Sequence, residues 1–254
     1  MEPYDLLATL ARDGEAFAEV AGAAASAGPS GLAQPVPSCP GWTLADLVWH
    51  LAEVHHFWRT IVGEQRDTWE GYQQPTRPAD DELVQFYREG LEHTVTVLAA
   101  AHPQQANWTW SHQRDAGFVM RRMAHETAVH LWDALQATGA SIPTEDGAGT
   151  SIDGEFAADG VDEFLHHFLT ADAIAAAGGS VHVHCTDVAG EWTVRQDVDG
   201  EPVVTREHSK GDAAMRGSAA ALLLALWRRI PLDTIDIVGD ADVARRVVAA
   251  AMLD

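Results

Sequence analysis

Cysteine and long apolar runs are scarce in this sequence of 254 residues. The cysteines are Cys39 and Cys185, and two thiols so far apart do not make a disulfide framework. No uninterrupted apolar run reaches the roughly eighteen residues that a membrane-spanning helix needs, and the N-terminus lacks a basic segment followed by an apolar one. We therefore expect a reduced, cytoplasmic protein that does not bind membranes.

Basic residues are also few, because 16 Lys and Arg stand against 38 Asp and Glu, for a formal net charge of −22. Nucleic acids and anionic membranes are bound by clustered Lys and Arg, so this composition argues against both as partners. The glycine-rich phosphate-binding motifs GxGxxG and GxxxxGK[ST] are absent, and no nucleotide cofactor is indicated.

Helical periodicity dominates the first half of the chain. Thr43, with Asp46 three residues later, is typical of a capping box at a helix start. Four long helices joined by short or moderate loops favour an antiparallel bundle, in which ligand sites lie between facing helices. The predicted helices are residues 3–26, 43–62, 79–101 and 116–137.

The second half of the chain has a different pattern, which predicts an α+β fold. A fifth helix is expected at about 153–170. Short alternating segments separated by glycine-containing turns indicate strands, and an apolar segment indicates a buried helix. We place the domain boundary in the loop 138–151, between a helical domain (1–150) and an α+β domain (151–254). The predicted elements are strands at 181–186, 191–196, 202–207 and 233–240, and helices at 217–230 and 240–252.

Three side chains of the predicted bundle form a candidate metal site. Glu126 and His130 are four residues apart, so they share one face of a helix. His50 lies within an apolar helix, where an imidazole needs a partner. Two nitrogens and a carboxylate are typical ligands of catalytic zinc, with a fourth position for water or substrate, although iron, nickel and manganese accept the same set. The alternative is an ordinary hydrogen-bonded core histidine.

The histidines near His50 and His130 in the sequence are weaker candidates for metal ligands. The segment HETAVH differs from the protease motif HExxH, because His125 and His130 are five residues apart and point in different directions. His55 and His56 are rivals of His50 as ligands, but neither shares its helix face.

Other polar and aromatic residues are weaker candidates. Trp108 and Trp110 precede the fourth helix and are expected to pack or to wall a pocket. His112 and Arg114 in the same loop are candidates for binding an anionic group of a substrate. Cys39 has no base nearby in the sequence, so cysteine–histidine catalysis has no local support.

Three further side chains are expected at the surface. Asp133 follows His130 by three residues and could orient it, but we expect it to face solvent. His182 and His184 share one face of a predicted strand and could bind a metal together. Surface histidines are the preferred interpretation there.

Two segments of the first half carry a family resemblance. VPSCPGWTLADLVWHLAEVHHFWR (36–59) and MRRMAHETAVHLWDA (120–134) resemble the mycothiol-dependent maleylpyruvate isomerase family of actinobacteria, which belongs to the wider DinB-like four-helix metalloproteins. The segments GSAAALLLALWRRI (217–230) and IDIVGDADVA (235–244) resemble the sterol-carrier-like α+β domain that follows the bundle in this family.

The resemblance implies a set of site residues. The family holds zinc on one histidine of the second helix and on Glu and His of the fourth, which correspond to His50, Glu126 and His130. A C-terminal arginine takes part in the isomerase reaction, and Arg228 or Arg229 is the nearest match.

The resemblance also implies a chemistry. A divalent metal, most simply Zn2+, would activate the thiolate of mycothiol or a similar thiol for cis–trans isomerisation or S-transfer on a small organic substrate. The alternatives are a hydrolase whose metal activates water, and a non-catalytic metal-binding or ligand-binding protein. A monomer or a homodimer is compatible with the sequence.

Overall fold

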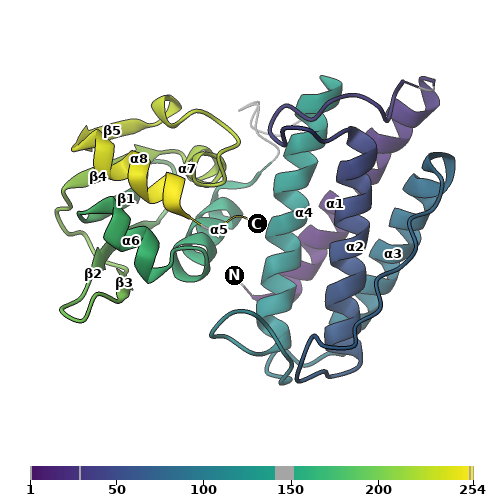
Figure 1. Cartoon of the computed structure of the whole chain (residues 1–254), viewed down its shortest axis with the longest axis horizontal. Helices are drawn as coiled ribbons and strands as arrows, with labels where there is room; N and C mark the ends of the chain where they lie inside the picture. Colours follow the sequence, from purple (N-terminus) through teal and green to yellow (C-terminus); the bar gives the residue numbers. More distant parts are fainter. Residues whose placement is uncertain (1, 29, 141–151, 252, 254) are drawn as a thin grey trace. The chain divides into compact units, whose positions relative to one another are not determined.

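The computed structural model describes residues 2–28, 30–140, 152–251 and 253. The chain divides into two compact units, Met1–Ser151 and Ile152–Asp254. Most of the predicted linker, from residue 141 to 151, lies outside the described residues. Helices make up the first unit and a sheet with helices the second, which confirms the predicted α+β class (Figure 1).

The first unit is a bundle, and four helices are present among its described residues (Figure 1). α1 packs against α3 and α4, and α2 packs against the same two helices. Leucine, alanine and aromatic side chains fill the interior, as the helical periodicity predicts. The helices are α1 (Pro3–Ser26), α2 (Leu44–Gly63), α3 (Asp80–Ala100) and α4 (Ala116–Thr138).

Local signals set the ends of the helices that carry the candidate ligands. The predicted capping box is present at the start of α2, where the Thr43 hydroxyl accepts a hydrogen bond from the Asp46 amide and the Asp46 carboxylate accepts one from the Thr43 amide. Asp115 caps α4 by accepting a hydrogen bond from the Phe118 amide. α4 ends at Gly139, whose φ of 67° lies in the left-handed region that favours glycine.

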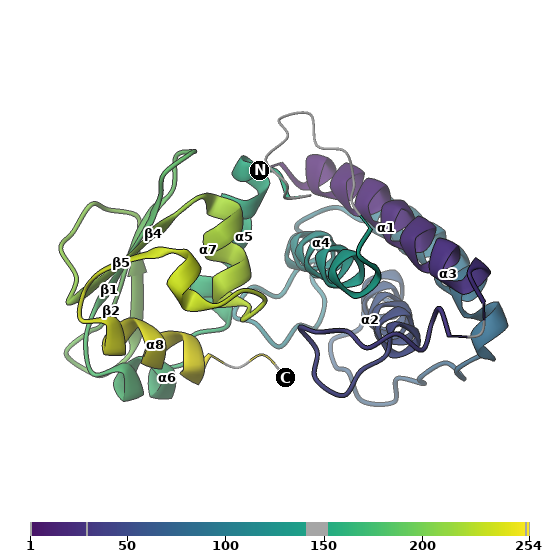
Figure 2. The ribbon, with the colours of Figure 1, turned by 90° about the horizontal axis from the view of Figure 1, so that it is seen from above.

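The second unit contains a mixed sheet with helices beside it (Figure 2). Its described strands lie in the order β3-β2-β1-β4-β5, and β1 and β4 are parallel whereas the other neighbours are antiparallel. The strands are β1 (Val181–Cys185), β2 (Glu191–Gln196), β3 (Pro202–Thr205), β4 (Ala213–Gly217) and β5 (Asp236–Gly239). The helices are α5 (Gly154–His167), α6 (Ala171–Ala177), α7 (Ala219–Leu226), the 3-10 helix η1 (Leu232–Thr234) and α8 (Ala241–Ala250).

Several elements of this unit differ from the expectation, and among them the helix α6 was not predicted. The sequence does not predict β4, because Ala213–Gly217 is rich in alanine and glycine, which are depleted in strands. The helix predicted at 217–230 ends earlier, at Leu226, since Arg228 adopts a left-handed φ of 58° and Pro231 follows. The rest of that helix is buried, as its apolar composition predicts.

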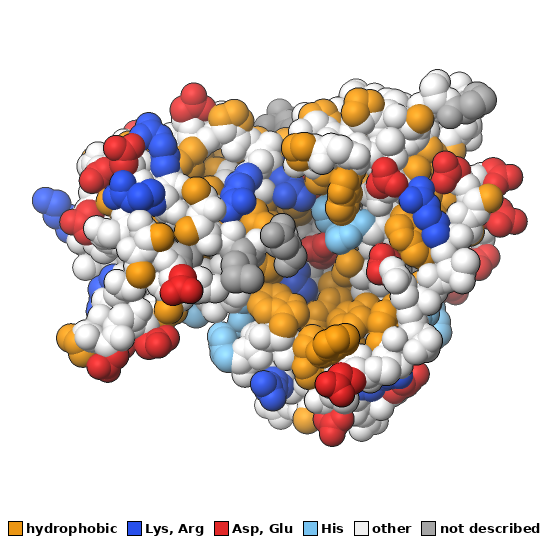
Figure 3. Space-filling view, in the orientation of Figure 1, with side chains coloured by type: hydrophobic (Ala, Val, Ile, Leu, Met, Phe, Trp, Pro, Cys, Tyr) orange, Lys and Arg blue, Asp and Glu red, His pale blue; other side chains and the backbone are white. Residues whose placement is uncertain are grey.

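Acidic and basic side chains are interspersed on the face of each unit drawn in Figure 3. In that view a histidine is also visible among hydrophobic side chains of the helical unit. Within the described ranges, no helix combines the length and the apolar character needed to span a bilayer.

His55 joins α2 to α4 inside the bundle and generates a prediction on stability. Its Nε2 lies 2.9 Å from the Thr127 hydroxyl, and both side chains are fully buried. Burial lowers the pKa of His55 from its ordinary 6.5 to about 3. Between these pH values the unfolded chain binds a proton that the folded protein does not, so the free energy of unfolding falls as the pH drops below 6.5.

We expect this loss to approach about 1.4 kcal/mol per pH unit below pH 6.5, because one proton is involved. The measurement is the free energy of urea unfolding between pH 6.5 and 5 for the native protein and for His55→Gln, which does not titrate. The Gln variant should be less stable at pH 7 and should show a shallower pH dependence. If the free energy of unfolding fell equally with pH in the two proteins, His55 would not be the group responsible for the pH dependence.

Candidate metal centre

Two histidines converge on one carboxylate oxygen between α2 and α4. Nε2 of His50 on α2 lies 3.1 Å from Oε1 of Glu126 on α4, and Nε2 of His130 lies 3.1 Å from the same oxygen. The three ligand atoms are all within 4.8 Å of one another. The structure therefore brings one ligand atom of each of the three predicted ligands close together.

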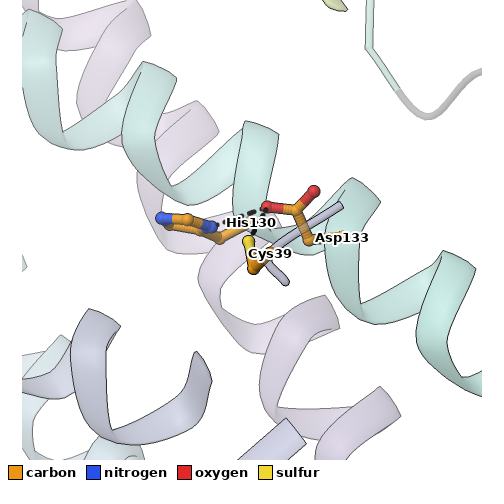
Figure 4. A group of neighbouring side chains, drawn as sticks. All are labelled: Cys39, His130 and Asp133. Atoms are coloured by element: carbon orange, nitrogen blue, oxygen red, sulfur yellow. Dashed lines mark hydrogen bonds and ion pairs between the residues drawn. The ribbon is translucent and has the colours of Figure 1, made fainter. Parts of the chain in front are cut away.

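Asp133 holds the opposite side of the His130 ring (Figure 4). Its Oδ2 lies 2.8 Å from Nδ1 of His130, and its Oδ1 accepts a 2.5 Å hydrogen bond from the Ser38 hydroxyl. The expectation that Asp133 faces solvent is wrong, since its exposed fraction is 0%. The loop that precedes α2 contributes Ser38 and covers this face of α4, which the helix periodicity alone does not reveal.

Cys39 acquires an acidic neighbour from the tertiary structure. Its Sγ lies 3.7 Å from Oδ2 of Asp133, although no base is near it in the sequence (Figure 4). Cys39, His130 and Asp133 are also close enough to share an ion. However, Asp133 is fully buried, whereas His50 on the Nε2 side of His130 is 32% exposed. A substrate can reach an ion on the His50 side, so that side is the better candidate for a catalytic metal.

Arg122 completes the surroundings of Glu126, and the sequence reasoning did not single it out. It is one turn before Glu126 on α4, and its guanidinium donates a 2.9 Å hydrogen bond to Oε2, the oxygen that the histidines leave free. The arginine is nearly buried, with a side-chain exposure of 5%. The available signal was the spacing of four residues between a basic and an acidic side chain.

The charges of this cluster are strongly coupled. Burial acts to raise the pKa of Glu126, but the charge and hydrogen bond of His130, the hydrogen bond of His50 and the charge of Arg122 hold it well below its usual range. Burial acts to lower the pKa of His130, but Glu126 and Asp133 outweigh burial and raise it to about 9. Without a metal, the pair is therefore a carboxylate and an imidazolium at neutral pH.

Other histidines of the bundle are engaged elsewhere. His55 contacts Thr127, as described above, and Nδ1 of His56 lies 2.8 Å from the Tyr72 hydroxyl. Neither rival of His50 therefore belongs to the cluster, in agreement with the helix-face argument.

The aromatic candidates have different surroundings, and Trp110 is 44% exposed. The Trp42 ring lies 4.9 Å from the His50 ring and borders the cluster. Trp108 stacks 6.1 Å from Trp58, and Trp110 meets Phe118 edge-on at 5.3 Å. These contacts favour the packing interpretation for Trp108 and Trp110. The roles suggested for His112 and Arg114 in binding an anionic substrate group stay predictions.

The Arg228 side chain caps the C-terminal end of α8 in the second unit. Its guanidinium donates hydrogen bonds of 2.8–3.0 Å to the carbonyl oxygens of Val248, Ala249 and Ala251, at the end of α8. These are carbonyls that a helix terminus leaves without intrahelical partners. Arg229 donates instead to the carbonyl of Trp227. A catalytic role for Arg228 or Arg229 stays a prediction.

Comparison with known proteins places this geometry in context. Residues 14–135 match the model of the mycothiol maleylpyruvate isomerase N-terminal domain, and residues 155–246 match the model of the C-terminal domain of the same family. The fold is similar to the crystal structure of a histidine-to-alanine mutant of the mycothiol-dependent maleylpyruvate isomerase, with a TM-score of 0.57 and 13% identity over 95% of each chain. Comparison with curated proteins found no match.

The free energy of unfolding of Arg228 variants tests whether this side chain caps α8. Hydrogen bonds to a charged group are worth roughly 1.5–3 kcal/mol, so we expect Arg228→Ala to lower the free energy of unfolding by about 2 kcal/mol. Arg228→Gly should cost about 1 kcal/mol less, because glycine is unstrained at the left-handed φ of 58°. Urea unfolding of the full chain measures both. An Ala variant as stable as the native protein would exclude the capping role.

Proposed function

We propose that this chain, which belongs to the mycothiol maleylpyruvate isomerase family, is a metal-dependent enzyme that uses a mycothiol-like thiol to isomerise a small unsaturated acid. The family match supports the isomerase type and the thiol cosubstrate. The convergence of two imidazole nitrogens on the Glu126 carboxylate supports the metal and is the observation that carries the proposal.

The donor set fits a divalent cation, and Zn2+ most simply. We assign His50, Glu126 and His130 as its ligands, each through the atom that already points at the common centre. Three protein ligands leave a coordination position for the thiol, which is typical of a catalytic site. Bound there, the metal would lower the pKa of the thiol, so that a nucleophilic thiolate is present at neutral pH.

The surrounding side chains would orient these ligands. Asp133 would accept a hydrogen bond from Nδ1–H of His130 and so leave Nε2 for the metal, an arrangement found around many metal-bound histidines. Arg122 holds Oε2 of Glu126 and directs Oε1 toward the histidines. Ser38 in turn fixes the Asp133 carboxylate.

The first prediction for this site couples metal content to activity. We expect Glu126→Ala and His130→Ala each to bind one metal equivalent fewer than the native protein, because each removes one of three ligands. In both variants the rate of thiol-dependent isomerisation of maleylpyruvate should fall by roughly a hundredfold or more. Mutation of a residue that only hydrogen-bonds to a metal ligand already lowers metal affinity or activity by roughly 10–100-fold. Elemental analysis and an isomerase assay with mycothiol provide the measurements.

His93→Ala is the matched control, because His93 is an exposed histidine of α3. It should keep both the metal and the activity. Full isomerase activity in metal-free His130→Ala would reject the proposed mechanism. Turnover without any thiol would instead indicate a hydrolase that activates water, and a stable thiol–substrate product would indicate S-transfer.

The second prediction concerns the pH dependence of zinc binding. A metal at Nε2 must displace a proton from His130, whose pKa is raised to about 9 by Glu126 and Asp133 despite burial. Zinc affinity should therefore rise about tenfold from pH 7 to pH 8 through this one proton, and should level off above pH 9.

Competition with a chromophoric chelator at each pH gives the affinity. Asp133→Asn removes one of the charges that raise the pKa of His130, so the pH dependence should weaken in that variant. An affinity that is the same at pH 7 and pH 8 in the native protein would show that His130 does not lose a proton on binding.

A further inference from the structure

A second cluster of histidines lies on the sheet of the C-terminal unit. His182 and His184 on β1 and His208 after β3 all reach Oε1 of Glu191 on β2. The distances from this oxygen are 3.0 Å to Nε2 of His182, 2.9 Å to Nδ1 of His184 and 2.5 Å to Nδ1 of His208. The expectation of surface histidines is wrong for His182, whose exposed fraction is 7%.

The strand register brings these residues together. Glu191 pairs directly with His184 across the antiparallel β1–β2 ladder, and His182 is two residues along on the same face of β1. β3 pairs with β2, so the chain returns along the sheet before it reaches His208. The Thr193 hydroxyl donates to the backbone carbonyl of Glu207 and holds this returning segment against β2.

Hydrogen bonding alone explains the cluster poorly. A carboxylate oxygen has about two lone pairs, so three ring nitrogens around Oε1 of Glu191 exceed its capacity. Three imidazoles close to one another are also unfavourable if more than one is protonated. A single cation among the four groups removes both difficulties, because each nitrogen then offers an electron pair to the ion and not a proton to the carboxylate.

We propose that His182, Glu191 and His208, with His184 as the fourth ligand, form a second binding site for a divalent transition metal such as Zn2+. The ligand atoms of the first three residues are all within 4.8 Å of one another. A tetrahedral zinc ion with bonds of about 2.0–2.1 Å separates neighbouring ligand atoms by about 3.3 Å, so side-chain rotations must draw these atoms closer. His184, which lies outside this group of three but is 2.9 Å from Oε1 of Glu191, must rotate as well. Imidazole-rich sets select zinc, copper or nickel over magnesium and calcium.

This second site would stabilise the fold. Four protein ligands leave no coordination position for a substrate, which is typical of structural zinc. The ligands also differ in exposure, because the His182 side chain is 9% exposed and the His208 side chain is 80% exposed. An ion would therefore fix the exposed segment around His208 to two strands of the sheet. The site does not depend on the function proposed for the bundle.

Zinc stoichiometry of the full-length protein tests the proposal. The protein is stripped with a chelator, dialysed against Zn2+ and analysed for bound metal. We expect about two equivalents in the native protein and in the His93→Ala control, and one equivalent in His208→Ala. His130→Ala should also retain one equivalent, and His130→Ala combined with His208→Ala none. His208 is exposed, so its variant should fold.

The outcomes separate the two sites. Retention of the native stoichiometry in His208→Ala, or complete loss of zinc in His130→Ala, would overturn the second site and leave the bundle site standing. Loss of all zinc in His208→Ala would support the second site and reject the one in the bundle. As an independent measurement, Zn2+ should raise the melting temperature of His130→Ala but not that of the double variant.

Discussion

The partly buried carboxylate of Glu126, whose side chain is 17% exposed, is the constraint around which the bundle is arranged. A charge inside a protein is costly unless charged or polar groups surround it. Glu126 meets His50 and His130 at one oxygen and Arg122 at the other. Because His50 comes from α2 and the others from α4, the interaction requires these two helices to pack in one orientation. The same requirement places the proposed metal ligands where two helices face each other.

Asp133 and the loop before α2 extend this arrangement outward. Asp133 is fully buried because Ser38 and Cys39 reach it from that loop, and its carboxylate in turn contacts Nδ1 of His130. A loop residue far away in the sequence thus influences the proposed metal ligand through a chain of two hydrogen bonds. One side of His130 is closed in this way, and the side toward the partly exposed His50 stays open for chemistry.

Both units join a carboxylate to several histidines, but with different consequences. In the bundle, two histidines and Glu126 would leave an open coordination position around a metal ion, and Arg122 and Asp133 hydrogen-bond to these proposed ligands. On the sheet, three histidines surround Glu191. The number of available ligands explains why we assign activation of a thiol to the first cluster and stabilisation to the second.

The sequence by itself determined the features that depend on spacing within one element. Helix periodicity and the Thr43 capping box predicted the helices, and the four-residue spacing of Glu126 and His130 predicted a shared face. The position of His50 in an apolar helix made it a candidate third ligand, and the family resemblance, confirmed by the domain matches, agreed with that choice.

Only the tertiary structure decided contacts between elements that are distant in the sequence. Asp133 faces inward because a loop almost a hundred residues earlier covers it, as its hydrogen bond to Ser38 shows. The β1–β2 register and the return of β3 bring Glu191 and His208 to His182. The physical reason is that the period of a helix or strand records which side chains share a face, whereas packing and register select what that face meets.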